Sequence, residues 1–593
     1  MSAGRHRSSL FAVLAVMLLF TFVSVRSSKE NAGGIIVSDV HGYYGYLHAV
    51  FITHDLGHER VRHEYVNVTP NGTLNKYFAG EALLLTPFFL SAHAYVKATG
   101  GVADGFSPPY ERAIAFAALI YALLGLLAFR ALLLHLGISD RTVATVLLML
   151  GFGTQLLQFT AVQPGWSHVY SFALFEFFLL LTQRIAVEAS VGRIIAWGVV
   201  LGMIVLVRPV NGLVLLAVPV VLGKATPDLL RSFRQKPVAT ALMMLAGASI
   251  VAIQPILWHA QVGSFVAYGY KGEGFQWGRP AILQVLIGIR RGLFIWTPVL
   301  VLAAFSVPLL WKHDRFRAIG AALYWLVITY VISSWWIWYY GSGFGARVYV
   351  EHYTVFALPL AFMLDRWQGW RRMAAITFLV FASALQLAQC YQYNHGFLDR
   401  ECMDRKKYAF SFLHFDADHH ERLGGRYMIA PYNPNGMDTL VHVRWDAERW
   451  VRYWHGKPVL FDPAPSPWHV VTCDTTDEFG PSFEMPAKDL PTGRALYFAL
   501  GFERYVFHAD DTRGITVVAS AENAKGEIVQ YQSFAMEPMP PAGDSLWEHI
   551  EYRVPLEPLR KGERVKFYFW NQDGKSRFLV DDLDMTVTAV RPY

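Results

Sequence analysis

The chain has 593 residues, of which 54% are hydrophobic and 17% are charged, and it includes 41 Phe and 18 Trp. A typical soluble chain is nearer ~25% charged. Residues 1–390 carry 29 Lys/Arg and 16 Asp/Glu (net +13), whereas residues 391–593 carry 23 and 30 (net −7). This composition excludes a single globular enzyme and an intrinsically disordered chain, and three cysteines exclude a disulfide-stabilised scaffold.

An uncharged run at residues 10–25 follows Arg5 and Arg7. It fits either a signal peptide or a first membrane helix, and we interpret it as a retained anchor because no small-residue cleavage site follows and further apolar runs do. Several of the further runs are shorter than the ~20 residues that a spanning helix needs. These runs lie at 113–134, 142–160, 168–183, 194–207, 210–222, 238–256, 293–311, 318–336, 353–364 and 373–390.

Clusters of Lys and Arg between the runs orient them, because cytoplasmic loops are enriched in these residues. The stretch 194–222 is long enough for a single span but contains Arg208-Pro209. Since proline interrupts a helix, we predict two short half-spans with Arg208 near their outer turn. The pattern therefore predicts a polytopic α-helical membrane protein of about eleven transmembrane helices. We place it in the plasma (inner) membrane, with a cytoplasmic N-terminus and an extracytoplasmic C-terminus.

The second half of the chain has a different pattern. From about residue 461 it contains short segments of alternating polarity bounded by turn residues, such as RALYFALGF and RVKFYFW. Such runs at roughly ten-residue spacing predict an antiparallel β-sandwich. We therefore divide the chain into a transmembrane domain (1–390), a connector on the outer membrane face (391–460) and an extracytoplasmic β-sandwich (461–593). Cys402 and Cys473 then either pair or remain two free thiols.

The first outer loop, residues 26–111, holds eight of the sixteen acidic residues of the membrane half. Its opening, SDVHGYYGY, places Asp39 shortly after the first span. An enzyme that uses a lipid-borne substrate needs a base near the membrane surface, because the reactive head of the lipid stays close to the bilayer. Asp39 meets this requirement. The alternative is a loop carboxylate that caps a short interfacial helix beginning with the Tyr run.

Three further polar residues lie on or near the outer side. Lys76 heads an apolar stretch and either binds a phosphate as a point charge or extends toward lipid headgroups. Arg208 is an ionisable group in an apolar setting, which is a functional hypothesis by default; the alternative is a structural pair with Glu176 or a backbone carbonyl. His168, at the outer mouth of the fourth span, is a weaker candidate, since a single interfacial His is usually structural.

The last two outer loops are rich in aromatic residues. The segment YGYKGEGFQW contains Lys271, and WWIWYYGSGFGARVY closes the ninth span. Trp and Tyr are common at membrane interfaces. A membrane interface does not explain the three glycines directly before Arg347. Glycines of this kind let a backbone approach a ligand closely. We recognise no metal-ligand spacing, Walker loop or dinucleotide fingerprint in the sequence.

Four stretches resemble the polytopic GT-C glycosyltransferases, in particular the bacterial branch related to the protein O-mannosyltransferases and the lipid A aminoarabinose transferases. They are SDVHGYYGY, NKYFAGEALLLTPFF, VLVRPVNG, and the pair RRGLFIWTPVL with WWIWYYGSGFGARVY, and together they cover most of residues 30–360. The tail segment FLVDDLDMTV resembles the closing strand of jelly-roll carbohydrate-binding-like modules. We interpret its Asp-Asp pair as a strand end rather than a calcium site.

The resemblance implies transfer of a sugar from a polyprenyl-phosphate donor, usually with inversion, to a hydroxyl of a lipid, polysaccharide or protein acceptor. The general base of the family falls on Asp39, and Asp55 is the nearest candidate for a second acidic residue. Cations that stabilise the leaving phosphate fall on Lys76, Arg208 and Arg347. We expect further substrate contacts from Tyr43, Tyr44, His168 and Lys271.

The sequence departs from the family pattern at Phe78, Glu81 and Ala346, where proline or a small residue is more usual, and this weakens any assignment of the sugar. We assign no metal and no certain cofactor, and leave a need for a divalent cation open. The partners are the donor, the acceptor and membrane lipids. Nucleic acid is not a partner, because much of the positive charge is an orientation signal.

Two other classes compete with a transferase. A transporter or flippase of lipid-linked saccharides needs ionisable residues deep along several spans, and here such residues are scarce apart from Arg208 and Glu176. An outer-surface carbohydrate-binding receptor with a membrane anchor would not need eleven spans.

Overall fold

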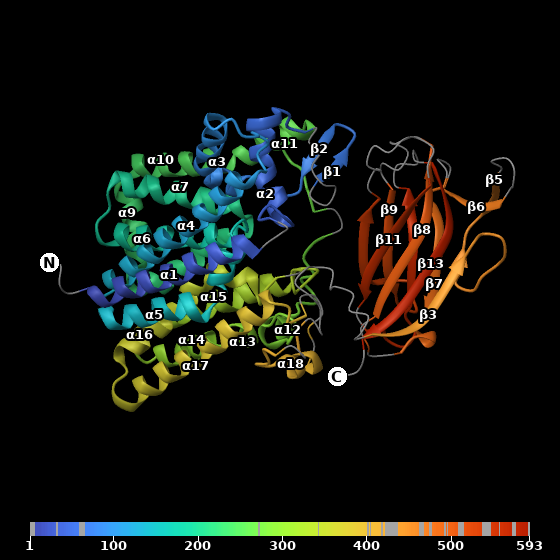
Figure 1. Cartoon of the computed structure of the whole chain (residues 1–593). Coiled ribbons are helices and arrows are strands. Elements are labelled where there is room, and N and C mark those ends of the chain that lie inside the picture. The colour runs from blue at the N-terminus through green and yellow to red at the C-terminus, as the bar shows by residue number, and fades with distance from the viewer. Residues whose placement is uncertain are drawn as a thin grey trace. The chain divides into compact units, whose positions relative to one another are not determined.

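The computed structural model describes residues 6–30, 34–57, 66–270, 273–341, 343–399, 403, 405–416, 419–420, 437–461, 468–473, 477–491, 494, 496–507, 515–536, 547–556, 558–571 and 577–590. The chain divides into two compact units, Met1–Tyr391 and Gln392–Tyr593. The first unit is helical and the second is built mainly from strands (Figure 1). A polytopic helical body followed by a β-sandwich is therefore confirmed.

The first unit begins with α1 (Arg7–Glu30), α2 (Asp39–His48), the π-helical η1 (Ala49–Thr53), a hairpin of β1 (Val66–Thr69) and β2 (Gly72–Asn75), and α3 (Gly80–Ala98). It continues with α4 (Pro108–His135), α5 (Asp140–Gly153), η2 (Gln158–Val162), α6 (His168–Val187), α7 (Val191–Val207), the 3-10 helix η3 (Pro209–Ala217) and α8 (Val218–Leu222). The last part contains α9 (Thr226–Gln235), α10 (Pro237–Val251), α11 (Ile253–Val262), α12 (Ile282–Ile287), α13 (Leu293–Trp296), α14 (Val299–Leu310), α15 (Arg315–Ser333), η5 (Arg347–His352), α16 (Tyr353–Arg366) and α17 (Gly369–Asn394). Much of the first outer loop is thus helical.

Among the described residues, seven helical segments are long and apolar enough to cross a membrane. They are Arg7–Ser27, Pro108–His135, His168–Val187, Pro209–Gln235, Pro237–Val262, Arg315–Ser333 and Gly369–Asn394. Two shorter apolar helices, Val191–Val207 and Val299–Leu310, accompany them. These helices support an integral membrane protein, and the figure of eleven crossings stays a prediction because several of the expected spans are shorter than ~20 residues.

The predicted break at Arg208-Pro209 is confirmed. Helix α7 ends at Val207, Arg208 adopts an extended conformation (φ −150°, ψ 112°), and the chain continues from Pro209 as a 3-10 helix. Proline lacks the backbone N–H that the α-helical ladder would need at this point. The side chain of Arg208 is therefore presented from an interruption rather than from a regular helix.

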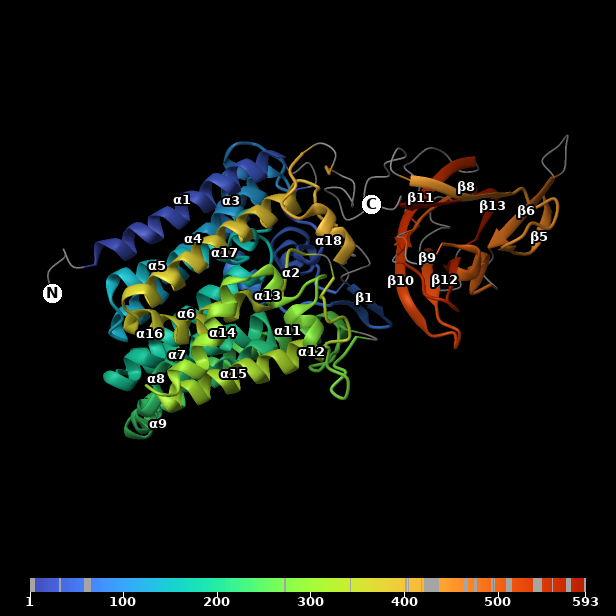
Figure 2. The same cartoon turned by 90° about the horizontal axis from the view of Figure 1, so that it is seen from below.

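Helix α6 forms the centre of the first unit, and 72% of the residues in its most apolar stretch are buried. It packs against α4 on one side and α7 on another, and α7 packs in turn against α10. Helix α1 lies along α5, as both views show (Figure 2). Helix α3 packs against α2, α4 and α7, so the elements that carry Asp39, His168 and Arg208 belong to one connected group of helices.

The second unit is an antiparallel β-sandwich. One sheet has the order β10-β9-β12-β7-β4, and the other has the order β11-β8-β13-β6-β5, with β3 paired to β13. The buried faces of both sheets supply one core, which includes Phe483, Phe498 and Phe567. The strands are β3 (Met437–Trp445), β4 (Trp454–His455), β5 (Pro458–Phe461), β6 (Trp468–Cys473), β7 (Phe479–Pro486), β8 (Leu496–Val506), β9 (Ile515–Glu522), β10 (Ile528–Ala535), β11 (Trp547–Leu556), β12 (Arg564–Asn571) and β13 (Phe578–Val590).

The sandwich starts earlier than residue 461, where the sequence pattern placed it. Strand β3 pairs with β13 along its length, from Met437 opposite Val590 to Trp445 opposite Leu583. The preceding part of the second unit contains α18 (Arg405–Ser411). Cys473 is buried, and Cys402 lies outside the described residues, so a bond between them stays a prediction.

Candidate active site

Asp39 is the first residue of α2 and its side chain is 21% exposed. A carboxylate is favourable in the first turn of a helix, where the backbone N–H groups give the end a partial positive charge. The residue in the capping position is Ser38, which has the left-handed φ of 55° that is uncommon outside glycine. Asp39 is therefore not the helix cap, and its two oxygens have other partners.

Both carboxylate oxygens of Asp39 accept a hydrogen bond from a distant part of the chain. The Tyr77 hydroxyl donates to Oδ1 at 2.7 Å, and Arg347 Nη1 donates to Oδ2 at 3.3 Å. Charge-assisted bonds of this kind are stronger than neutral ones and fix the plane of the carboxylate. Three of the predicted motifs thus meet at one carboxylate.

Tyr77 reaches Asp39 because Gly42 leaves room for its ring. A Cβ atom at position 42 would lie 2.0 Å from the Tyr77 ring. Asn75 locks the contact by donating from Nδ2 to the Gly42 carbonyl at 2.8 Å and accepting from the Tyr77 N–H at 2.9 Å. Burial, and then the nearby charge of Asp39, raise the pKa of Tyr77 well above its ordinary value. The phenol therefore stays protonated and acts as a donor.

Arg347 begins η5, directly after the glycine-rich segment that ends the outer loop. Its guanidinium lies 4.0 Å from the centroid of the Trp166 ring, a cation–π contact. Nη2 donates to the Tyr340 carbonyl at 2.6 Å, while Nη1 faces Asp39. The side chain is 12% exposed. These contacts hold the cation in one orientation beside the candidate base.

A small pocket opens next to Arg347. Arg291, from the RRGLFIWTPVL motif, lines it together with Arg347, Tyr340 and Tyr349. Arg291 is almost fully buried. One arginine from each of the two paired motifs thus lines the same pocket.

Arg208 belongs to a second, more buried group centred on Glu351. One oxygen of Glu351 accepts from Arg208 Nη1 at 3.5 Å and from Asn211 Nδ2 at 3.2 Å, and the other lies 3.0 Å from His168 Nδ1. The Glu351 side chain is 1% exposed. The structural pair weighed for Arg208 thus exists, but Glu351 is the partner. Glu176 instead accepts a hydrogen bond from the Thr354 hydroxyl.

Lys76 lies at the junction of two outer loops. Its ammonium group pairs with Glu273 and lies 5.0 Å from the centroid of the Tyr270 ring. The Tyr270 ring in turn contacts the Tyr77 ring at 6.3 Å between centroids. The loop 257–292 therefore contacts the first outer loop at Lys76 and at the neighbouring Tyr77. Lys76 would have to exchange Glu273 for a phosphate in order to bind one.

Glu81 is the second residue of α3 and is fully buried. Neither of its carboxyl oxygens has a hydrogen-bond partner among the described residues. It interacts electrostatically with Arg208 and with Asp39. Gly80 allows this approach, since a Cβ there would lie 2.4 Å from the backbone nitrogen of Val207. A buried carboxyl group without a partner is costly, which is typical of a functional position.

The structure brings five of the predicted site residues close to Asp39 or into the Glu351 group, either by direct contact or through Tyr77. Arg347 bonds to Asp39, Arg208 and His168 bond to Glu351, and Lys76 precedes Tyr77. The Tyr43 ring packs against the Tyr77 ring at 4.6 Å between centroids, tilted by 59°, and Tyr43 interacts electrostatically with Arg208 and Asp39.

Three other predicted residues are not placed in this site. Tyr44 donates its hydroxyl to the Gly105 carbonyl and packs against Phe89, which is a structural role. Asp55 is exposed and follows η1. The helical segment between Asp39 and Asp55 is roughly 20 Å long at ~1.5 Å per residue. Lys271 lies outside the described residues.

Sequence reasoning did not single out Glu351, Tyr77 and Arg291, which the structure places in the candidate site. Glu351 had a usable signal, since it is an acidic residue at the head of an apolar run. Tyr77 and Arg291 both lie inside motifs that were noted, but neither residue type by itself distinguishes a site residue from an interfacial one. Their roles become visible only when their distant partners are known.

Comparison with known proteins gives no match to a family model and no match among curated proteins. Solved structures show similarity to the archaeal oligosaccharyltransferase AglB from Archaeoglobus fulgidus in complex with an inhibitory peptide and a dolichol-phosphate. That alignment has 10% identity and a TM-score of 0.36, and covers 72% of this chain and 61% of that one. The chain thus spans less than two thirds of that protein.

Two other solved structures are also similar. The arabinosyltransferase EmbB from Mycobacterium smegmatis has 13% identity and a TM-score of 0.29, with 98% of this chain and 64% of that chain covered. The CBM22-1 xylan-binding domain from Paenibacillus barcinonensis Xyn10C has 12% identity and a TM-score of 0.18, with 26% and 97% covered. TM-scores below 0.5 describe a loose likeness, so the functional proposal rests on the residues of the site.

Proposed function

We propose that the protein is an integral membrane glycosyltransferase that moves a sugar from a polyprenyl-phosphate donor to an acceptor hydroxyl on the extracytoplasmic face. The observation that carries this proposal is the joining of Asp39, Tyr77 and Arg347 by two hydrogen bonds, of 2.7 and 3.3 Å. These residues come from three motifs that resemble those of the GT-C glycosyltransferases. In such a site the carboxylate can accept a proton, the phenol orients the carboxylate, and the guanidinium group can bind an anion beside it.

Asp39 is proposed as the general base. Each carboxylate oxygen can accept more than one hydrogen bond, so an acceptor hydroxyl can donate to Asp39 while Tyr77 and Arg347 keep it oriented. Its 21% exposure leaves the carboxylate reachable from outside. A base within hydrogen-bond reach of the attacking hydroxyl contributes typically 10²–10⁴-fold to a rate. Direct attack by that hydroxyl on the anomeric carbon inverts its configuration.

Arg347 and Arg291 are proposed to bind the donor phosphate at the small pocket that they line, which has room for about one water molecule and has to widen to admit the phosphate. Negative charge develops on the phosphate as the glycosidic bond breaks, and fixed cations stabilise it. The planar guanidinium group suits phosphate because it donates two parallel hydrogen bonds. Arg208 and Lys76 are proposed as further cations, each held until binding by its carboxylate partner, Glu351 or Glu273.

A donor panel tests the proposal. Purified protein is incubated with radiolabelled polyprenyl-phosphate sugars and total envelope acceptors, and the label that becomes attached to an acceptor is counted. We expect one donor to be used, and Arg347→Ala to raise the KM for that donor. The pocket assignment fails if Arg347→Ala leaves both KM and kcat unchanged.

A parallel assay separates transfer from transport of the same lipid. In sealed vesicles that contain the protein but no acceptor, a flippase would move the labelled lipid-linked saccharide between leaflets. A transferase would leave the distribution unchanged. Movement without covalent transfer in either assay would replace the proposed function with the transporter alternative.

A further inference from the structure

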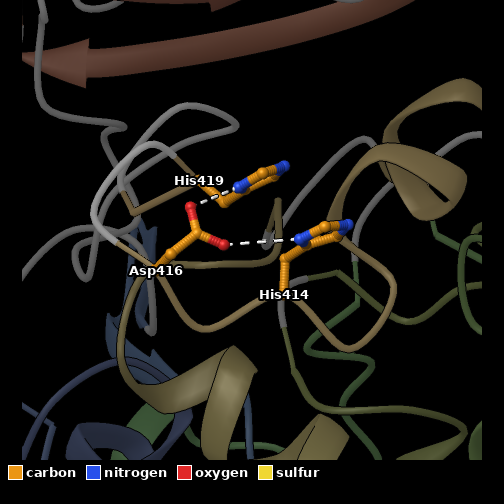
Figure 3. A group of neighbouring side chains, drawn as sticks. All are labelled: His414, Asp416 and His419. Carbon is orange, nitrogen blue, oxygen red and sulfur yellow. Dashed lines mark hydrogen bonds and ion pairs between the residues drawn. The ribbon is translucent and has the colours of Figure 1, made fainter.

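The turn that follows α18 in the second unit carries a compact group of nitrogen and oxygen ligands. His414, Asp416 and His419 project from this turn toward one another (Figure 3). One candidate ligand atom from each residue lies within 4.8 Å of the other two. Their spacing, His-x-Asp-x-x-His, places all three on a single short stretch of backbone.

The Asp416 carboxylate lies beside the two imidazole rings and bridges their edges (Figure 3). Its Oδ1 is 2.6 Å from His419 Nδ1, and its Oδ2 is 3.3 Å from His414 Nδ1. The rings are stacked, with centroids 3.9 Å apart and an interplanar angle of 9°. Both Nδ1 atoms therefore face the same carboxylate from the same side.

The backbone that leads to His414 is held by hydrogen bonds. Gln392, a buried residue near the end of α17, donates from Nε2 to the Ser411 carbonyl at 2.6 Å and to the His414 carbonyl at 2.8 Å. The Phe410 ring packs on the His419 ring at 4.5 Å between centroids. These contacts limit the movement of His414 and of the His419 ring.

We propose that His414, Asp416 and His419 bind a zinc ion through the two Nδ1 atoms and one carboxylate oxygen, with a fourth position open to water. A tetrahedral zinc ion with bonds of ~2.0–2.2 Å keeps its ligand atoms roughly 3.4 Å apart. Asp416 Oδ2 and His414 Nδ1 are 3.3 Å apart and already have this separation. One candidate ligand atom from each of the three residues lies within 4.8 Å of the other two, so the remaining separations need to change by about 1.4 Å or less. Two imidazoles favour zinc over magnesium or calcium, which take oxygen ligands.

The ligands are accessible to an ion from solution. The side chains of His414 and Asp416 are 49% and 50% exposed, and that of His419 is 19% exposed. Exposure also fits a solvated turn in which the carboxylate simply accepts two hydrogen bonds. The two interpretations differ in whether zinc binds with a defined stoichiometry that depends on all three residues.

The test uses the full chain without a polyhistidine tag, stripped with a chelator and dialysed against zinc. The zinc bound per chain is measured by elemental analysis, and its affinity by competition with an indicator dye. The wild type is expected to hold one more zinc ion than the double variant Asp416→Asn/His419→Ala. His419→Ala alone is expected to weaken the affinity at least tenfold.

His420→Ala is the matched control, because it removes a neighbouring imidazole whose ring packs against Phe397 instead. It is expected to keep the wild-type stoichiometry. If the double variant fails to fold, Asp416→Asn alone is used, since it preserves the shape of the side chain. Equal zinc content in the wild type and the variants would overturn the proposal, as would displacement of zinc by equimolar magnesium or calcium.

Discussion

Replacing Tyr77 by Phe removes a single hydrogen bond to the proposed base. The ring remains, so its packing on Gly42 and its contact with Tyr43 are kept. The bond that is lost measures 2.7 Å and ends on a charged acceptor. Hydrogen bonds to charged groups contribute about 1.5–3 kcal/mol, which corresponds to a fall of roughly 10- to 150-fold in kcat/KM if the bond is needed in the transition state.

The assay is initial-rate transfer of label from the donor identified in the panel, with donor and acceptor concentrations varied separately. We expect kcat to fall and the KM for the donor to change little, because Tyr77 contacts the base and not the pocket that Arg347 lines. The free energy of unfolding is expected to change little, since Asp39 is partly exposed and water can replace the phenol.

Tyr44→Phe is the matched control for this experiment. It removes the hydroxyl of another buried tyrosine in the first outer loop, which donates its hydrogen bond to the Gly105 carbonyl and not to Asp39. This variant is expected to lose some stability and to keep its kcat/KM. Equal rates for Tyr77→Phe and the wild type, or equal losses in the two tyrosine variants, would refute the role of Tyr77 in orienting Asp39.

Two further predictions concern stability. Glu351→Gln leaves Arg208 without its buried counter-charge, and removing one partner of a buried pair costs about 3–5 kcal/mol. We expect a loss of stability at the lower end of this range because the Arg208 side chain is 19% exposed. An unchanged thermal unfolding midpoint in detergent would contradict this prediction. Burial raises the pKa of Asp581 to about 6, against the smaller opposing effect of the hydrogen bond that the Asp582 N–H donates to it. This pKa lies above that of an exposed Asp, so the protonated form favours the fold and stability falls as pH rises from about 4 through 6. Asp581→Asn should therefore raise the unfolding midpoint at pH 7.5 more than at pH 4.5, and equal shifts at the two pH values would count against it.

Local features of the fold were predictable from the sequence. Pro209 predicted the end of a helix at the preceding residues, because the effect of proline on a helix depends only on its immediate neighbours. Alternation of polarity predicted strands such as Leu496–Val506 for the same reason. The start of the sandwich was not predictable, because Met437–Trp445 is recognised as part of it only through its pairing with β13.

The candidate site shows the same limit. Asp39, Arg208 and Arg347 were each identifiable as polar residues in motifs or in apolar surroundings. Which residues pair with one another was not predictable, because the Arg347–Asp39 and Arg208–Glu351 contacts join residues 308 and 143 positions apart in the chain. A contact at such a separation depends on the packing of several helices, which hydropathy does not specify.

The central claim, that Asp39 is the base of a sugar transfer, is tested most directly by single-turnover transfer with Asp39→Asn. Asp55→Asn is the matched control, since it makes the same change at the exposed carboxylate after η1. We predict that Asp39→Asn loses transfer by about 10²-fold or more while it still folds, inserts and binds the donor, and that Asp55→Asn transfers at the wild-type rate. Wild-type transfer by Asp39→Asn would contradict the claim.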